Sequence, residues 1–349
     1  MGGGLAGTFL AANLVQKGAS VIQYADPQKI PASSVAAGLV NPVTGRQFAI
    51  SWKAIEFLTA LESFFQLPGF ESLAVHYHSL PIYRPFPDIR SCNDWTARSH
   101  DSRFDDIATY TYEAWKPEWL INPLGGMIIH RGGWLNVNSF IIATRDLLQK
   151  TGRFQFIAEK INYSAIDPQL YQLQRLEGNI EYSHLVFCEG IYGTLNPWFP
   201  AKLVPLKGQL ITFRTRPNLN RIISSGQFMV PLGEDLYRLG STYELNYYTE
   251  APDAEPPQEL VQGLSSFWLH KVTEWVKLEA GIRPTTLDRK PIIGQHPEWP
   301  TLWIFNGLGT KGVLQAPALA TQLANAILNQ SPGEILKDCN PYRITLHKP

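Results

Sequence analysis

Three glycines in "MGGGLAG" have the spacing of a nucleotide-binding turn. Gly2, Gly4 and Gly7 fit the pattern G-x-G-x-x-G. Its first glycine makes a tight turn, the second lets the backbone approach a pyrophosphate, and the third lets a helix pack closely on a sheet. Leu5 and Ala6 would then lie at a helix N-terminus, where a negatively charged phosphate is favoured. A flexible glycine-rich terminus is the alternative interpretation.

A nucleotide site of this kind usually has an acidic residue ~20 residues beyond the glycines, which binds the adenosine ribose. Counted from Gly2, that place falls on Ala25, and Asp26 follows one residue later. Asp26 either binds the ribose from a shifted register or is a turn residue before Pro27. In the second case the ribose would be held by backbone groups.

Small side chains dominate the next segment, "ASSVAAGLVNPVTGR". Small residues such as Ala37 and Gly38 let a backbone lie close to a flat ligand, and Ser33, Ser34 and Arg46 can bind phosphate or ring oxygens. Alone, the segment would indicate a plain surface loop. Beside a nucleotide-binding turn, we interpret it as part of the ligand site.

Two further motifs lie in the last ninety residues. In "EAGIRPTTLDRKPIIG", Arg283 stands between a glycine turn and a proline, on a stretch that is otherwise apolar or small. "TLWIFNGLGTKGVLQAPALATQLANAIL" then predicts a strand, a glycine-rich loop and an amphipathic helix that starts near Gly312.

The elements that must position these motifs alternate between helix and strand. "TFLAANLVQKG" predicts a helix, and "ASVIQYAD" a buried strand, which is half of a βαβ unit. "FQFIAEKI" and "LVFCEG" predict two further strands. The second ends at Gly190, where a sheet is expected to end against a bound cofactor.

The second half of the chain has a different pattern. "VPLKGQLITF", "GQFMVPL" and "LYRLGSTYE" are rich in β-branched and aromatic residues with closely spaced turn signals, which predicts an inserted antiparallel sheet. "PPQELVQGLSSFWLHKVTEWVKL" returns to helical spacing.

The composition narrows the class of protein. The 30 basic and 30 acidic side chains balance, which argues against general nucleic-acid binding. No apolar run reaches the ~18 residues of a membrane span. Three scattered cysteines suit a reducing compartment, and we expect a cytoplasmic enzyme. His76 and His78 have no third candidate ligand near them, so we expect no metal site.

Three blocks, "GGGLAGTFLAANLVQKG", "GIRPTTLDRKPIIG" and "NGLGTKGVLQAPALA", resemble the D-amino-acid oxidase superfamily of FAD enzymes, which contains glycine oxidase and sarcosine oxidase. "GGWLN", "VPLKGQLI" and "GSTYE" are weaker matches, and all lie in the family's order. The resemblance therefore covers nearly the whole chain. It favours the glycines as a true nucleotide-binding turn.

The resemblance implies an α/β fold with two domains. One is a Rossmann-like FAD-binding domain, with βαβ units around a central parallel sheet, and the other is an inserted antiparallel-sheet α+β substrate domain. We assign residues 1–50, 126–200 and 278–349 to the first, and 51–125 and 201–277 to the second. We expect the strand ahead of the glycine turn, ordinarily ~5–6 residues long, to be truncated.

The resemblance also implies roles for single residues. An arginine at the position of Arg283 binds the substrate carboxylate, which suits a planar guanidinium; an ion pair with Asp288 is the alternative. Tyr243 would line the substrate pocket or be a cross-strand aromatic residue, and Ile161 would contact the adenine. The residues expected along the pyrimidine edge of the flavin are Gly307, Gly309, Thr310, Lys311, Gly312 and Val313. Among these, Lys311 either adds a positive charge at the flavin or is a solvated loop residue.

The implied reaction is the oxidation of a C–N bond in a small amine or amino acid. A hydride would pass from the substrate's α-carbon to flavin N5, and water would hydrolyse the resulting imine. Oxygen, a quinone or a carrier protein would accept the electrons. One alternative is a tRNA enzyme that oxidises a carboxymethylamino group on a wobble base. Another is a non-catalytic nucleotide-binding protein that lacks a complete FAD site.

Overall fold

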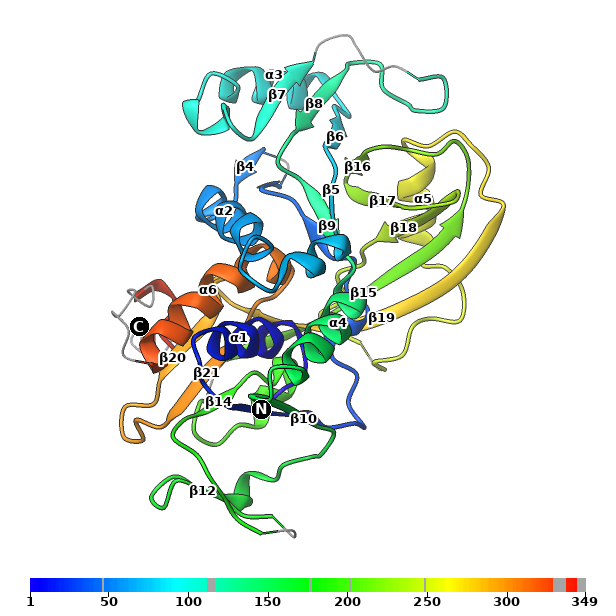
Figure 1. The fold of residues 1–349 in the computed structure, drawn as a ribbon. Coiled ribbons are helices and arrows are strands. Elements are labelled where there is room, and N and C mark those ends of the chain that lie inside the picture. The colour runs from blue at the N-terminus through cyan, green and yellow to red at the C-terminus, as the bar shows by residue number, and fades with distance from the viewer. Residues whose placement is uncertain are drawn as a thin grey trace, which may run out of the picture. The chain divides into compact units, whose positions relative to one another are not determined.

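The chain forms two compact units in the computed structural model (Figure 1). The first comprises Met1–Ser34, Asn138–Leu206 and Ile282–Pro349, and the second comprises Val35–Val137 and Lys207–Gly281. The structure describes residues 1–45, 47–111, 117–175, 178–200, 202–247, 249–328 and 337–343. Arg46, which was expected to bind phosphate or ring oxygens, lies outside the described residues.

Among the described residues, the first unit is built mainly from short strands and three α-helices. The helices are α1 (Leu5–Gln16), α4 (Val137–Gln149) and α6 (Gly312–Ile327). The strands are β1 (Val21–Tyr24), β10 (Phe154–Ile157), β11 (Ile166–Asp167), β12 (Gln172–Leu173), β13 (Ile180–Glu181), β14 (Leu185–Phe187), β20 (Ile292–Gln295) and β21 (Leu302–Asn306).

Parallel pairing dominates around the glycine turn. β1 runs parallel to β10, with Val21 opposite Phe154, and β14 runs parallel to β21, with Leu185 opposite Leu302. β20 is antiparallel to β21, and β11, β12 and β13 form a small antiparallel sheet. Each of β1 and β10 follows a helix along the chain, as in βαβ units. The expected α/β class is confirmed.

Helices α1 and α6 contact each other within this unit, as Figure 1 also shows. Both helices have small alanine residues that are buried, which allows their backbones to approach. The buried Asn13 of α1 accepts a hydrogen bond of 2.8 Å from the hydroxyl of Thr321 on α6. The two helices therefore form one packed layer.

The second unit contains most of a large sheet. Its helices are α2 (Ala54–Phe64), α3 (Ile89–Arg98) and α5 (Gln258–Ser265). Its strands are β2 (Leu39–Val40), β3 (Val43–Thr44), β4 (Ala49–Ile50), β5 (Tyr77–Ser79), β6 (Ile82–Pro85), β7 (Ala108–Thr111), β8 (Gly126–Ile129), β9 (Gly133–Leu135), β15 (Leu203–Arg214), β16 (Ile222–Ser225), β17 (Gln227–Gly233), β18 (Leu236–Gly240) and β19 (Glu274–Thr286).

The large sheet has eight strands in the order β19-β15-β18-β17-β16-β6-β8-β7. Its strands β15, β17 and β18 are antiparallel and match the three strands that the sequence predicts there. The chain passes between the two units within β15 and β19. Tyr83, Phe213 and Leu239 belong to one of its buried apolar clusters.

The helical prediction for 256–278 is wrong beyond its first part. Helix α5 ends at Ser265, and β19 begins at Glu274. The indole of Trp268 donates to the hydroxyl of Thr215, 3.1 Å away, and Thr273 donates its backbone N–H to the carbonyl of Arg214. The apolar spacing of this segment fits a helix or a strand equally well, and its pairing beside β15 makes it a strand.

The unit bounds differ from the predicted domain bounds. Residues 35–50, 126–137 and 278–281, predicted for the FAD-binding domain, lie in the second unit, and residues 202–206, predicted for the substrate domain, lie in the first. The cofactor and substrate roles of the two parts stay predictions. Among the residues that the structure describes, no helix combines the length and apolar character that a membrane crossing requires.

Gly7→Ala should destabilise the protein, because the added Cβ would lie 2.2 Å from the carbonyl oxygen of Gly2. Overpacking of this kind costs about 1–3 kcal/mol, so thermal unfolding without added cofactor should occur at a lower temperature. Gly4→Ala is the matched control, because its Cβ would lie 3.1 Å from the Ser33 hydroxyl. Equal melting temperatures for the two variants would contradict the prediction.

Candidate cofactor site

The glycine turn is enclosed by backbone on two sides. Gly2 has a φ of +117°, and a Cβ there would lie 2.0 Å from the carbonyl oxygen of Cys188. The Gly2 N–H donates to the carbonyl of Tyr24 at the end of β1, 2.7 Å away. Only glycine fits this position, because a side chain would need both an unfavourable φ and space that backbone occupies.

The N-terminus of α1 has the features of an anion site. Gly4 caps the helix without a side-chain hydrogen bond, and the first turn contains no acidic side chain. The Leu5 N–H donates to the Ser33 hydroxyl, 3.0 Å away. Ser33 thus lies at the helix end, whereas the Ser34 hydroxyl donates to the Pro31 carbonyl. Whether either serine binds a phosphate stays a prediction. A helix end of this kind favours a phosphate.

The glycine loop between β21 and α6 is held by one buried amide. Asn306, 3% exposed, accepts a hydrogen bond from the Gly307 N–H and donates its Nδ2 to the Gly190 carbonyl, at 2.8 and 2.9 Å. Gly307 and Gly309 have φ values of +73° and +54°. Sequence reasoning missed Asn306. Its signal was a polar residue at the end of an apolar strand.

The first turn of α6 lies beside the first turn of α1. A Cβ on Gly312 would lie 3.2 Å from Cδ2 of Leu5, so the first residues of the two helices are neighbours. Lys311 caps α6, Val313 is buried and Thr310 is exposed. Two helix N-termini, each carrying partial positive charge, therefore converge in the first unit.

Lys311 lies in an environment that disfavours its charged form. Burial lowers the pKa of the Lys311 ammonium, and the nearby charge of Arg289 acts in the same direction. Both causes would be offset by a negatively charged group close to Lys311. The α6 end is therefore suited to an anionic ligand.

Arg283 lies on the last part of β19, next to the glycine loop. The Gly309 N–H donates to the carbonyl of Pro284, 3.1 Å away, and the Thr285 hydroxyl donates to the Val204 carbonyl, 2.5 Å away. The Arg283 side chain is half-buried. The structure thus brings the segment that carries Arg283 beside the loop that was predicted to line the flavin.

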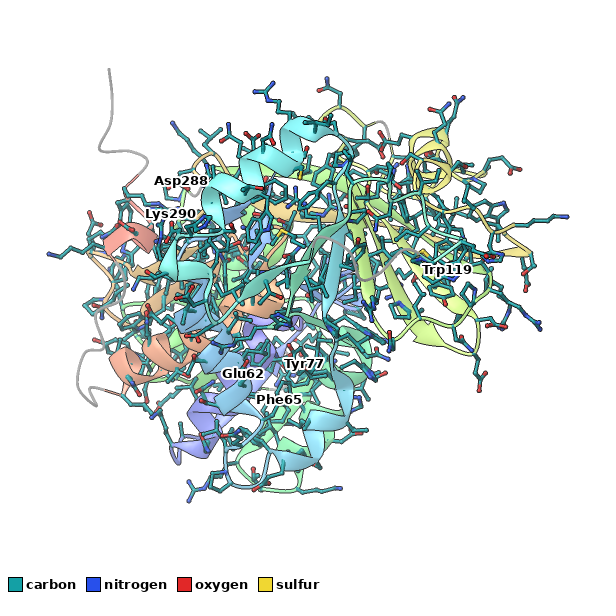
Figure 2. The ribbon with its side chains drawn as sticks, turned by 90° about the horizontal axis from the view of Figure 1, so that it is seen from above. Glu62, Phe65, Tyr77, Trp119, Asp288 and Lys290 are labelled. Carbon is teal, nitrogen blue, oxygen red and sulfur yellow. The ribbon has the colours of Figure 1, made fainter. Side chains whose placement is uncertain are left out.

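Asp288 has a strong partner in Arg343. The Arg343 guanidinium donates to both carboxylate oxygens, at 2.7 and 2.9 Å, and the backbone N–H of Lys290 donates to one of them. Asp288 and Lys290 are labelled in Figure 2. Burial acts to raise the pKa of Asp288, but these hydrogen bonds outweigh it and lower the pKa to about 2. This contact is bidentate, the geometry proposed for arginine and carboxylate in the substrate site.

Asp26 forms a local turn just after β1. Its carboxylate accepts a hydrogen bond of 3.0 Å from the Gln28 backbone N–H and lies 3.9 Å from the Lys29 ammonium. This arrangement is the turn that Asp residues commonly form with their own backbone. Whether Asp26 also binds a ribose stays a prediction.

Arg145, which sequence reasoning missed, reaches the glycine turn from α4. Its Nη2 donates to the Gly3 carbonyl, 2.5 Å away, and its guanidinium lies 3.9 Å from the ring centroid of Phe156. A Cβ on Gly3 would also lie 2.8 Å from the Cβ of Ala25. The Arg145 guanidinium and the Ala25 methyl group therefore lie near the place where a nucleotide site of this kind usually has its ribose-binding acidic residue.

The segment after β14 carries a half-buried acid, Glu189, beside Gly190. Burial raises the pKa of Glu189, which accepts hydrogen bonds from the Tyr163 hydroxyl and the Asn196 amide, at 3.0 and 2.9 Å. Sequence reasoning missed Glu189, although an acid at the end of an apolar strand was a signal. Ile161 packs against the apolar cluster that includes Phe187, and its contact with adenine stays a prediction.

Three expected site residues belong to the second unit. Gly38 has a φ of +71°, and its Cβ would lie 1.9 Å from the Leu135 carbonyl oxygen, so the pairing of β2 and β9 by itself requires glycine. Ala37 is half-buried, and Tyr243 is 63% exposed. Their roles toward cofactor or substrate stay predictions.

Known proteins of similar sequence are oxidoreductases and bifunctional proteins. The tRNA 5-methylaminomethyl-2-thiouridine biosynthesis bifunctional protein MnmC of Haemophilus ducreyi is 23% identical over 95% of this chain and 56% of that protein. Glycine oxidase of Pseudomonas aeruginosa is 26% identical over 40% of this chain and 38% of the enzyme. The chain thus spans about half, or less, of the length of these curated relatives.

Solved structures share the fold over nearly the full chain. Glycine oxidase from Geobacillus kaustophilus matches with a TM-score of 0.83 and 19% identity, covering 100% of this chain and 98% of that one. L-proline dehydrogenase from P. horikoshii matches with a TM-score of 0.73 and 14% identity, covering 99% and 96%. Residues 1–326 match the family described as FAD dependent oxidoreductase. The resemblance seen in the three motifs is confirmed: the chain belongs to the family of FAD dependent oxidoreductases, with FAD as its cofactor.

Proposed function

We propose that this protein oxidises the C–N bond of a small amine or amino acid. The observation that carries the proposal is the meeting of three features in the first unit: the N-terminus of α1, the N-terminus of α6 and the segment of Arg283, which is bonded to the loop before α6. FAD, when bound, accepts the two electrons and the hydride that such an oxidation releases.

The residues present fit a dinucleotide with a flavin at one end. The turn at Gly2 has no room for a larger side chain, and the first turn of α1 lacks acidic residues, so both suit a pyrophosphate. The α6 end with Lys311 suits the part of the flavin on which negative charge collects during reduction. Gly307 and Gly309 let the backbone of the loop come close to a flat ring.

Arg283 is the proposed anchor of the substrate carboxylate. A guanidinium binds a carboxylate through two parallel hydrogen bonds, which fixes both the position and the orientation of the substrate. Such placement is the main contribution that a protein makes when the cofactor carries the chemistry. Tyr243 is a further candidate for the substrate pocket.

A tRNA substrate is the second candidate function. It is favoured by the relative named for tRNA 5-methylaminomethyl-2-thiouridine biosynthesis, because that match extends over 95% of this chain. The balanced charge of 30 basic and 30 acidic residues argues against a general affinity for nucleic acid. In both candidate functions the oxidised group is the C–N bond of an amine.

The test of the proposal is reduction of the bound flavin. Protein loaded with FAD would be mixed without oxygen with glycine, sarcosine, proline, D-amino acids or carboxymethylaminomethyl-modified tRNA, and flavin absorbance would be followed. Bleaching by a free amine or amino acid supports the proposal. Bleaching by the modified tRNA alone would establish the second candidate, and no bleaching by any of them would refute both.

Arg283→Ala should raise the KM for carboxylate substrates by roughly 10- to 100-fold, because hydrogen bonds to a charged group are lost. Arg283→Lys should recover only part of the loss, since lysine cannot bind through two parallel bonds. Arg289→Ala is the control for loss of a nearby cation. An unchanged KM in Arg283→Ala, with FAD still bound, would show that Arg283 is not the anchor.

Lys311→Gln should make the reduction potential of the bound flavin more negative. Removal of a cation disfavours the added negative charge, and a shift of roughly 30 mV corresponds to about 1.4 kcal/mol for two electrons. The measurement is a reductive titration against a reference dye. Lys290→Gln is the control, because the Lys290 ammonium pairs with Asp338 at 2.9 Å. Equal potentials in both variants would contradict the prediction.

A further inference from the structure

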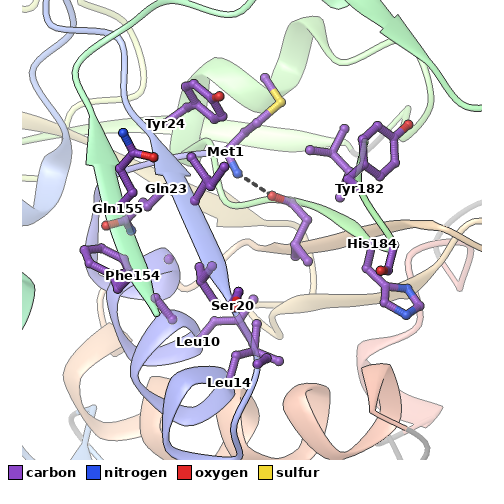
Figure 3. Close-up of a pocket in the computed structure, with 18 of the residues that line it drawn as sticks. Met1, Leu10, Leu14, Ser20, Gln23, Tyr24, Phe154, Gln155, Tyr182 and His184 are labelled. Atoms are coloured by element: carbon purple, nitrogen blue, oxygen red, sulfur yellow. Dashed lines mark hydrogen bonds between the residues drawn. The ribbon is translucent and has the colours of Figure 1, made fainter. Parts of the chain in front are cut away.

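Strand edges in this protein differ in what lies beside them. In the first unit, β1 and β14 face a groove of about 690 Å³, where the Met1 amine donates to the Val186 carbonyl (Figure 3). Rossmann-like sheets have a strand at this place, ahead of the glycine turn, so the groove is part of the fold already described. The edge of β19 in the second unit has no such explanation.

The phase of β19 shows which of its residues face the open edge. Among the described residues, β19 lies at one end of the eight-stranded sheet, with β15 as its neighbour (Figure 1). The Thr273 N–H donates to the Arg214 carbonyl of β15, whereas the Pro284 carbonyl accepts from Gly309, away from β15. Successive residues of a strand direct their backbone groups to opposite edges. Residues of odd number therefore face β15, and residues of even number face the open edge.

Four residues of the second unit have their backbone groups at this open edge. They are Glu274, Val276, Leu278 and Ala280. Among the described residues, no backbone group of another segment bonds to them there. The segment 274–281 contains no proline, and the side chains of Trp275 and Val276 are 38% and 43% exposed. Edge strands that stay unpaired are commonly short, or carry a proline, a bulge or a cover. The segment 274–281 therefore suits pairing with a further strand.

The charged side chains of this segment have the spacing of a self-complementary strand. Lys277 and Glu279 lie two residues apart, and the Lys277 ammonium donates to the Glu279 carboxylate at 2.7 Å, so both are on one face. Two identical antiparallel strands can pair around a two-fold axis at Leu278. Lys277 of each copy then lies opposite Glu279 of the other. Trp275 lies opposite Gly281, where an aromatic ring can cover the glycine backbone.

Neighbouring registers lack this complementarity. An axis at Lys277 or at Glu279 would place two like charges directly opposite each other, which is destabilising. An axis at Val276 would place Lys277 opposite Trp275 and would leave no pair of opposite charges. Among axes at residues 276 to 279, the one at Leu278 is therefore favoured by charge.

We propose that the open edge of β19 is a dimer interface, at which a second copy of this chain adds its own β19 in antiparallel orientation. The two-fold axis passes through Leu278. The backbone groups of Val276, Leu278 and Ala280 pair across the interface, which is the mode known as β-strand addition. The two pairs of Lys277 with Glu279 fix the register. The large sheet then continues from one copy into the other.

The first test is the mass of the FAD-loaded protein, measured by analytical ultracentrifugation over a range of concentrations. The expected result is a dimer that Val276→Pro dissociates, because this proline removes an N–H at the open edge and none that bonds to β15. Val276→Thr is the matched control, since it keeps both the N–H and the β-branched shape. A monomer at every concentration would overturn the proposal, and so would a dimer that Val276→Pro leaves intact.

The second test reverses the charges. Lys277→Glu should raise the dissociation constant of the dimer at least roughly tenfold, because it places like charges opposite each other twice. Lys150→Glu, at an exposed position at the end of α4, is the control for a change of net charge and should leave the dimer unchanged. Equal dissociation constants for the two variants would contradict the assigned register.

A mixture of two variants then tests the register directly. Lys277→Glu has acidic side chains at both positions, and Glu279→Lys has basic ones, so each alone places like charges opposite each other. A pair of one copy of each places opposite charges at both contacts, and mixing should therefore restore the dimer. Because Glu279 also lies 3.7 Å from Arg238, thermal unfolding must first show that its variant is folded. Two folded variants that fail to associate on mixing would overturn the proposal.

Cross-linking gives a measurement that does not depend on the charge variants. In a Cys92→Ser background, where the two remaining cysteines are buried, Leu278→Cys should form a disulfide between copies under mild oxidation. Residues that pair directly have Cα atoms about 5.5 Å apart, within the range of a disulfide. Val276→Cys should not cross-link, because its two copies would lie about 14 Å apart. Cross-linking through position 276 but not through position 278 would overturn the proposal.

Discussion

The first unit depends on contact of backbone with backbone at the glycine turn. A Cβ on Gly2 would lie 2.0 Å from the Cys188 carbonyl oxygen, and one on Gly7 would lie 2.2 Å from that of Gly2. These contacts set how closely α1 approaches the strands, and thereby where its N-terminus lies. The position of the α1 end in turn determines its distance from α6, because Gly312 lies against Leu5.

The convergence of two helix N-termini gives the site a positive electrostatic potential that comes mainly from the backbone and less from charged side chains. Partial charges at helix ends are fixed by the backbone and need no reorganisation when a ligand binds. The lowered pKa of Lys311 fits this picture, because burial and the charge of Arg289 disfavour another cation there. In the proposed function, the same features would bind a pyrophosphate at one end and a reducible ring at the other.

The sequence predicted the turn, the parallel strands and the antiparallel sheet, because glycine spacing and apolar periodicity are local properties. It did not predict β19, because an apolar spacing that fits a helix was overridden by pairing next to β15. Nor did it predict the contacts of Arg145, Glu189 or Asn306. A polar residue at the end of an apolar strand marked Asn306 and Glu189, but the partners Gly3, Tyr163 and Gly190 lie 142, 26 and 116 residues away, so the contacts themselves could not be predicted from a local pattern.

The amide of Asn306 couples the motion of two neighbouring loops. One rigid planar group holds the residue after β21 and the turn after β14 at once, through Gly307 and Gly190. Separation of the two strand ends would therefore break the hydrogen bond between the buried Asn306 amide and Gly190, which leaves an unsatisfied polar group at a cost. Loops that leave neighbouring strands would thus fluctuate as one body, and a flat ligand lying across them would meet a single stiff rim.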